Sequence, residues 1–253
     1  MIELLAGLFG LLIGSFLNVC IYRWPRDLSV VRPRSACPEC GKPITAYDNI
    51  PVLSYLLLRG RCRNCAARIF WRYPLVEVLT AISFAFFVYT YGLTPAAAKY
   101  CVFAALLIGL AFSDFETLLL PDEMTIGGLV IGLVFSPFVP VPDAIFQNSA
   151  VEAVAGACVC SGLLWFTGWL FEKIRHKEGL GFGDVKMLAM EGAFLGVAGS
   201  IKTMVVASVL ASVVGLIYIK LAHKDPATFQ IPFGTFLAFA GLLVAVAIPR
   251  LAF

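Results

Sequence analysis

Long apolar runs separated by short polar stretches dominate this chain. Most runs contain about 17–22 residues, and a helix of about 20 apolar residues spans the hydrocarbon core of a bilayer. The pattern predicts eight membrane-crossing helices, of which the sixth is the shortest. Their residue ranges are 4–22, 75–91, 97–113, 124–141, 151–171, 185–198, 203–221 and 231–248. We expect the first run to be retained as a helix, because it lacks the basic segment that begins a signal peptide.

Composition excludes most other classes of protein. The chain has 253 residues, of which 60% are hydrophobic and only 14% charged, whereas soluble domains contain about 25% charged residues. Its mean hydropathy is +0.90. These values exclude a soluble globular domain, a disordered chain, a collagen-like fibre and a small disulfide-stapled secreted domain. The predicted fold class is an all-α polytopic membrane protein.

One polar segment, residues 23–73, interrupts the apolar pattern and predicts the orientation of the chain. It carries ten of the 19 Lys and Arg residues but only three acids, an excess of +7. Cytoplasmic loops of membrane proteins are enriched in Lys and Arg. With eight crossings, a cytoplasmic insertion leaves only Lys99, Lys202 and Arg250 outside, so that 16 of the 19 lie inside. Both chain ends are then expected to face outward.

Four cysteines in this insertion form two Cys-x-x-Cys pairs. Cys37 and Cys40 make the first pair, Cys62 and Cys65 make the second, and 21 residues separate the pairs. Four thiolates are the ligand set of a closed, structural zinc site, and Gly41 permits the tight turn that such a site needs. Two disulfides or a single redox-active pair are the alternatives, although a cytoplasmic location disfavours stable disulfides.

Two aspartates stand at predicted helix ends. Asp114 closes the third predicted helix, and Asp184 opens the sixth within Gly181-Phe-Gly183-Asp-Val-Lys186. The predicted topology puts both at the cytoplasmic face. Two adjacent carboxylates cannot both ionise easily, so one can take a proton from water while the other donates a proton to a carbonyl or leaving amine. That is the chemistry of an aspartic peptidase. Helix caps or solvated loop residues are the structural alternative.

Glu191 follows Asp184 by two helical turns and is predicted to share its face. We expect its carboxyl group to bond to a neighbouring helix rather than to tune the aspartates. Other catalytic signatures are missing from the sequence, which contains no His-Glu-x-x-His helix, no Gly-x-Ser-x-Gly elbow and no Walker-type phosphate loop.

Together these motifs resemble the GxGD aspartic peptidases of the bacterial type IV prepilin peptidase family. The resemblance extends over nearly the whole chain. It rests on the Gly-Phe-Gly-Asp-Val-Lys stretch, the upstream Asp…Leu-Pro-Asp, the opening Gly-Ser-Phe-Leu-Asn-Val, the paired cysteines with Asn-Ile-Pro and Arg-Gly-Arg-Cys, and Tyr-Pro-Leu-Val-Glu.

The resemblance implies a bifunctional enzyme of the bacterial inner membrane. It would cleave the leader of type IV prepilins or of related pseudopilins after a glycine, then N-methylate the new N-terminal residue with S-adenosylmethionine. Asp114 and Asp184 would be catalytic, and four residues would support them: Asp122, Gly181, Gly183 and Lys186. The partners are these substrates and the lipid bilayer, with no nucleic acid.

The implied domains are a first transmembrane helix (1–22), a cytoplasmic zinc-binding domain associated with methyl transfer (23–73) and a transmembrane peptidase domain (74–253). The sequence does not identify residues that bind the methyl donor. Polar or permissive candidates in the N-terminal part are Glu3, Asn18, Gly60 and Glu77.

Two other functions compete with this interpretation. A proton-coupled transporter could use Asp114, Asp184 and Glu191 as a proton relay, although the broken helix pair typical of many transporters is not evident. A non-enzymatic assembly scaffold could use the zinc domain for docking.

Overall fold

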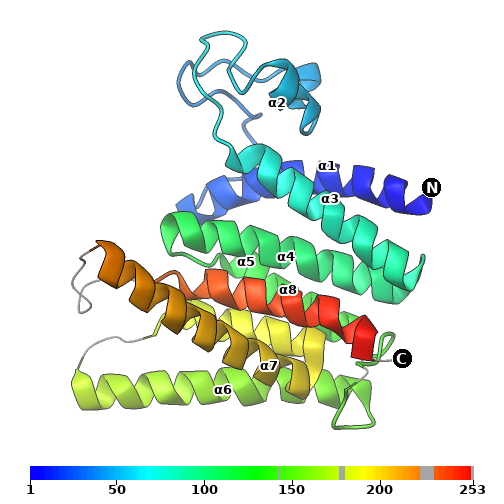
Figure 1. The fold of residues 1–253 in the computed structure, drawn as a ribbon, viewed down its shortest axis with the longest axis vertical. Coiled ribbons are helices and arrows are strands. Elements are labelled where there is room, and N and C mark those ends of the chain that lie inside the picture. The colour runs from blue at the N-terminus through cyan, green and yellow to red at the C-terminus, as the bar shows by residue number, and fades with distance from the viewer. Residues whose placement is uncertain (142, 177–179, 223–230, 252–253) are drawn as a thin grey trace. The chain divides into compact units, whose positions relative to one another are not determined.

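A computed structural model describes residues 1–141, 143–176, 180–222 and 231–251. Five of its helices are long and apolar enough to cross a membrane (Figure 1), which confirms the all-helical membrane fold. They are α1 (Ile2–Arg23), α3 (Arg72–Tyr91), α4 (Pro95–Thr117), α6 (Ser149–Arg175) and α7 (Phe182–Ala222). Within the described residues, the only β-structure is two isolated bridges.

Helix lengths do not establish the eight predicted crossings. Helix α5 (Asp122–Phe135) has only 14 residues, and the apolar part of α8 (Phe233–Leu251) extends from Phe233 to Ala247. The sixth and seventh predicted helices are joined in α7, which has 41 residues. The predicted separation at residues 199–202 is helical, and the two helices are instead separated at Gly196, where the backbone is not helical.

The chain divides into two compact units, residues 1–109 and 110–253. In the first unit, α1 packs closely on α3 through two glycines. A Cβ atom at Gly14 would lie 2.6 Å from Cα of Glu77, and one at Gly10 would lie 2.8 Å from Cα of Ala81. Small residues permit such close backbone approach between membrane helices. The buried Asn18 then links the same helices by donating to the Tyr73 carbonyl at 3.0 Å.

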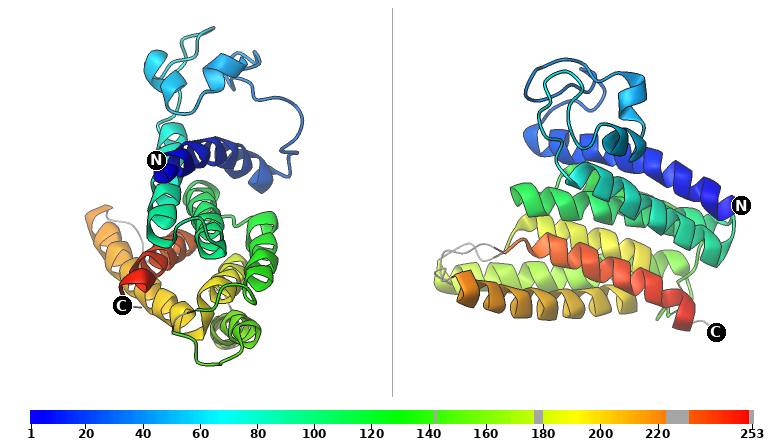
Figure 2. Two further views of the ribbon diagram at one scale, coloured as in Figure 1. Left: turned by 90° about the vertical axis from the view of Figure 1, so that its right-hand side faces the viewer. Right: turned by 45° about the horizontal axis from the view of Figure 1, so that its top comes forward.

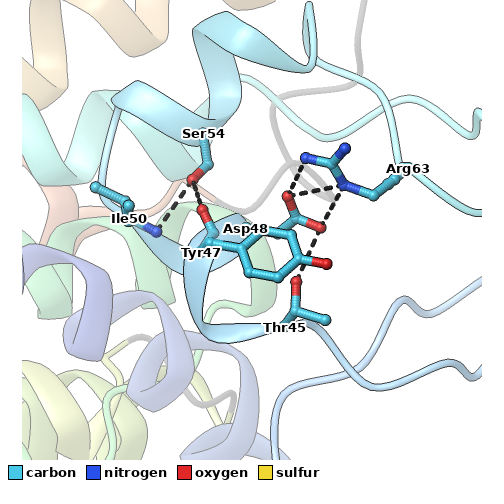
Figure 3. Close-up of polar contacts among 6 residues, drawn as sticks. All are labelled: Thr45, Tyr47, Asp48, Ile50, Ser54 and Arg63. Atoms are coloured by element: carbon cyan, nitrogen blue, oxygen red, sulfur yellow. Dashed lines mark hydrogen bonds and ion pairs between the residues drawn. The ribbon is translucent and has the colours of Figure 1, made fainter.

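The polar insertion between α1 and α3 contains little regular structure. Its elements are two 3-10 turns, η1 (Trp24–Arg26) and η2 (Ala46–Asn49), and the short helix α2 (Leu53–Leu57). Side chains from two later segments of the insertion hydrogen-bond to residues of η2 (Figure 3). Ser54 of α2 donates to the Tyr47 carbonyl at 2.8 Å, and Arg63 makes a two-point contact with Asp48. This Arg63 hydrogen bond holds the pKa of Asp48 below its ordinary value.

In the second unit, α7 is broken at Gly196, where φ is +72°. The two parts of α7 run in different directions (Figures 1 and 2), and only glycine adopts this backbone conformation readily. Such a break removes helical hydrogen bonds. The buried Glu152 of α6 compensates by accepting the Val197 N–H at 2.8 Å.

Glu152 also binds the loop that precedes α6. Its Oε2 atom accepts the backbone N–H groups of Ile145 and Phe146 at 3.0 and 2.9 Å. We expect Glu152→Ala to lower the free energy of unfolding by about 3 kcal/mol or more, because three backbone donors lose their acceptor. Thermal unfolding followed by circular dichroism measures this loss. Glu172→Ala, an exposed position on the same helix, is the matched control. Equal melting temperatures for both variants would contradict the capping role.

Candidate active site and metal centre

The two sequence-predicted aspartates lie at helix ends in the second unit. Asp114 is in the last turn of α4, which closes through a hydrogen bond of 2.8 Å from the Leu118 N–H to the Asp114 carbonyl, with Leu118 at φ +55°. Asp184 is in the first turn of α7. Asp114 is buried and Asp184 is half-buried. Leu120 lies against both Gly183, the neighbour of Asp184, and Gly234, which approaches Asp114, so the fold brings together two helix ends whose aspartates are 70 residues apart in the sequence.

Glycines let the segment between α4 and α5 pack against these helix ends. A Cβ atom at Gly183 would lie 3.1 Å from Cβ of Leu120, and one at Gly234 would lie 3.0 Å from Cδ1 of the same leucine. The Gly234 atom would also lie 3.1 Å from Cγ of Asp114. At Gly181 the nearest atom is Oδ2 of Asp184, at 3.3 Å. Larger residues would therefore crowd Leu120 or the carboxylates themselves.

Thr235, in the first turn of α8, binds Asp114 directly. Its backbone N–H donates to Oδ2 of Asp114 at 2.7 Å, and its hydroxyl lies 3.0 Å from the same oxygen and 3.1 Å from the Ala111 carbonyl. A helix N-terminus also carries a partial positive charge that favours a nearby carboxylate. Thr235 was not predicted as a site residue, because a threonine in an apolar segment gives no signal in the sequence. The Pro-Phe-Gly stretch before it could have drawn attention to Gly234.

Removal of the Thr235 hydroxyl should impair the site without unfolding it. We expect Thr235→Val to lower the turnover rate by roughly 10- to 150-fold, since a hydrogen bond to a charged group contributes about 1.5–3 kcal/mol. Thr235→Ser should retain nearly full activity. The matched control is Thr203→Val in α7, because the buried Thr203 hydroxyl has no hydrogen-bond partner among the described residues. A turnover rate for Thr235→Val equal to that of the control would exclude this role.

Two of the predicted supporting residues pair with each other. Lys186, near the start of α7, forms an ion pair with Asp122, the first residue of α5. The Asp122 side chain is 57% exposed, so the pair contributes little to stability. Its effect is to connect the N-terminal turns of two helices beside the site.

Glu191 differs from the expectation. It is fully buried, and neither carboxyl oxygen has a hydrogen-bond partner among the described residues. The predicted bond to a neighbouring helix is therefore wrong. The spacing of Glu191, seven residues from Asp184, places it on the same helical face as that aspartate, as predicted from the sequence.

The four insertion cysteines converge as a metal site requires. The sulfur atoms of Cys37, Cys40, Cys62 and Cys65 all lie within 4.8 Å of one another. Four thiolates around one ion match tetrahedral zinc. Hydrogen bonds from the backbone N–H groups of Cys65 and Asn64 lower the pKa of Cys62 to about 7, which favours the thiolate that binds metal. The donor set therefore fits a zinc ion.

Each cysteine pair forms the same tight turn. Gly41 (φ +67°) donates its N–H to the Cys37 carbonyl at 2.9 Å, and Ala66 (φ +57°) donates to the Cys62 carbonyl at the same distance. The sequence predicted the role of Gly41 but gave no indication that alanine would occupy the equivalent strained position.

This difference makes two opposite substitutions informative. We expect Ala66→Gly to stabilise the metal-loaded insertion by about 0.5–1 kcal/mol, because glycine relieves strain at positive φ. Gly41→Ala should destabilise it by a similar amount. Chelator competition, monitored as the rate of zinc loss, compares both variants with the parent chain. Identical rates for the two would contradict the equivalence of the turns.

Comparison with known proteins agrees with this arrangement. Residues 8–91 match the model of the bacterial peptidase A24 N-terminal domain, and residues 101–220 match that of the type IV leader peptidase family. A prepilin leader peptidase/N-methyltransferase of Pseudomonas putida is 38% identical over 96% of this chain and 89% of the relative. Proteins of the same description from Pseudomonas aeruginosa and Neisseria gonorrhoeae are 35% and 34% identical, over 92% and 96% of this chain and 86% and 90% of the relatives.

No solved structure matches the chain significantly. The two family models fall on either side of residues 92–100, and the second includes both Asp114 and Asp184. With the paired carboxylates, the four-cysteine cluster and relatives that align over nearly its full length, this chain belongs to the type IV leader peptidase family.

Proposed function

We propose that Asp114 and Asp184 are the catalytic pair that removes the leader of a type IV prepilin or a related pseudopilin. The chain is a peptidase and a methyltransferase, as its relatives' descriptions state. The observation that carries the catalytic assignment is the convergence of the α4 and α7 ends that bear these aspartates on Leu120 and Gly234, beside Thr235.

The two carboxylates have different surroundings, which suggests different roles. Asp114 accepts the Thr235 N–H, which stabilises its ionised form. It is therefore the base that takes a proton from water, and the resulting hydroxide attacks the carbonyl carbon of the scissile bond. Asp184 starts protonated and donates to the carbonyl oxygen. As the C–N bond breaks, the leaving amine takes the proton held by Asp114, and the new carboxyl group returns one to Asp184.

The position of the pair suits a membrane-embedded substrate. A prepilin presents an apolar helix within the bilayer and a polar leader outside it, so its scissile bond lies near the headgroup boundary. Asp114 and Asp184 lie at helix ends, where water is available. We place this face, together with the insertion, on the cytoplasmic side of the inner membrane, since the insertion carries ten of the 19 basic residues. Eight crossings, with α7 contributing two, satisfy this topology.

The remaining assignments concern the insertion and the methyl donor. Zinc bound by the four cysteines would hold the insertion in shape without taking part in cleavage, because a closed thiolate shell has no open position. S-adenosylmethionine would supply the methyl group for the new N-terminal amine. The transporter alternative has no support among the relatives.

Mass spectrometry of a purified prepilin tests this function. Incubation with the intact chain and S-adenosylmethionine should produce a pilin that lacks its leader and carries one methyl group. An unchanged prepilin, with the protein folded and zinc-loaded, would contradict the proposed function.

A further inference from the structure

The polar insertion lies beside the helices α1 and α3 rather than beyond their ends (Figures 1 and 2). The backbone N–H of Val52, which precedes α2, donates to Oε2 of Glu77 in α3 at 2.7 Å. A cavity of about 380 Å³ is lined by Phe16 and Val19 of α1 and by Ile44 of the insertion. The insertion therefore folds back along the sides of two helices that are long and apolar enough to cross a membrane.

Aromatic side chains indicate the depth of these contacts in the bilayer. Tyr22, near the end of α1, and Trp71, the N-cap of α3, are both exposed, and such residues are enriched at membrane–water interfaces. Glu77 follows Trp71 by six residues, which corresponds to roughly 9 Å along the helix axis. Phe16 precedes Tyr22 by the same number of residues. Helix α2 begins directly after Val52, so it starts deeper in the bilayer than these aromatic side chains.

Helix α2 carries an exposed apolar face. Leu53, Leu56 and Leu57 are 49%, 64% and 73% exposed, and their spacing places them on one side of the helix. We call these three side chains the leucine face. Ser54, by contrast, is buried and donates to the Tyr47 carbonyl. Water contact with a leucine face is unfavourable, whereas lipid acyl chains at this depth provide an apolar environment.

Three arginines follow the leucine face. Arg59 and Arg61 come directly after α2, and an isolated β-bridge places Arg68 opposite Arg61. We call these three residues the arginine cluster. All three are exposed, and none forms an ion pair in the part of the chain that the structure describes. Uncompensated guanidinium groups next to a membrane interface favour the phosphates of anionic lipid headgroups.

We propose that the leucine face is buried among lipid acyl chains and that the arginine cluster binds the phosphates of anionic headgroups. Helix α2 thereby anchors the insertion to the membrane. Its apolar and cationic groups follow one another in the order in which a phospholipid leaflet presents acyl chains and phosphates. A protein partner would have to reach the same depth in the bilayer and supply acids for the arginines. This anchoring does not depend on the cleavage or methylation reaction.

Photo-crosslinking of the full chain to lipids tests the anchoring. The nanodiscs contain equal amounts of phosphatidylglycerol and phosphatidylcholine, each with a diazirine near the end of one acyl chain. Mass spectrometry locates the adducts and distinguishes the two lipids by mass. Leu163 and Phe166, which are exposed on α6, are the positive controls for contact with acyl chains. Asn64, which is exposed in the second cysteine turn, is the control expected to remain unlabelled.

We expect the leucine face to be labelled to an extent comparable with the two α6 positions. Phosphatidylglycerol adducts should exceed phosphatidylcholine adducts about fivefold, a factor that corresponds to the attraction of one arginine to an anionic surface. The double variant Arg59→Gln/Arg68→Gln should lower this ratio to about twofold or less. Arg32→Gln/Lys42→Gln removes two exposed charges outside the arginine cluster and should keep the parent ratio. Zinc content shows that the insertion of each variant is folded.

Two results would contradict the proposed anchoring. An unlabelled leucine face beside labelled α6 positions would overturn it, and a second chain in the same nanodiscs would then identify the occupant as another copy of the protein. Equal labelling by the two lipids in the parent chain would overturn the binding of anionic headgroups by the arginine cluster.

Discussion

Asp184→Asn should abolish leader cleavage while methylation of an already cleaved pilin continues. The asparagine side chain keeps the shape of the aspartate but cannot donate a proton to the carbonyl oxygen. We expect the cleavage rate to fall by about 10³-fold or more, a typical value for loss of a general acid. Methylation should persist because Asp184 lies in the part of the chain that matches the peptidase model, residues 101–220, whereas the N-terminal part matches a separate model over residues 8–91. Mass spectrometry of a full-length prepilin and of a synthetic mature pilin measures the two activities separately.

The acid Asp143 provides the control for this experiment. It is exposed and pairs with Lys202, so Asp143→Asn should retain most of the cleavage activity. Simultaneous loss of cleavage and methylation in a folded, zinc-loaded Asp184→Asn protein would instead indicate one shared site.

Cys62→Ser should remove zinc from the insertion. The four sulfur atoms form a single cluster, and serine is a poor substitute for a thiolate that is already favoured at Cys62 by backbone N–H groups. Binding of structural zinc contributes roughly 10–16 kcal/mol to small zinc domains, so its loss should unfold the insertion. Elemental analysis should show stoichiometric zinc in the parent chain and little in the variant, and proteolysis should become faster between residues 23 and 73.

Cys158→Ser is the matched control, because Cys158 is exposed on α6 and lies outside the cluster. It should retain full zinc and normal resistance to proteolysis. Unchanged zinc in Cys62→Ser would contradict the four-thiolate site.

Local sequence patterns predicted the parts of this protein that depend on local physics. Runs of apolar residues predicted the long helices, because helix length and lipid thickness are directly related. The Cys-x-x-Cys pairs predicted a metal cluster, because the ligand spacing is itself the signal. The aspartates could be identified as candidates from their positions at predicted helix ends.

Contacts between distant segments could not be predicted in this way. The break in α7 depends on Glu152, 44 residues away from Gly196, which supplies the missing acceptor. Thr235 approaches Asp114 from a different helix, and nothing in its own neighbourhood indicates that partner. Glu191 lies on the predicted helical face but lacks the predicted hydrogen bond. The helical period indicates which face a side chain occupies, but it does not indicate which group that side chain contacts.

The most direct test of the catalytic pair compares three cleavage rates: Asp114→Asn, Asp184→Asn and the double variant. Residues that act as one unit show strongly non-additive losses, because removal of either disables the same step. We predict that each single variant loses nearly all cleavage and that the double variant is no slower than the singles. Substantial cleavage by either single variant, or a double-variant loss equal to the product of the single losses, would contradict catalysis by a joint aspartate pair.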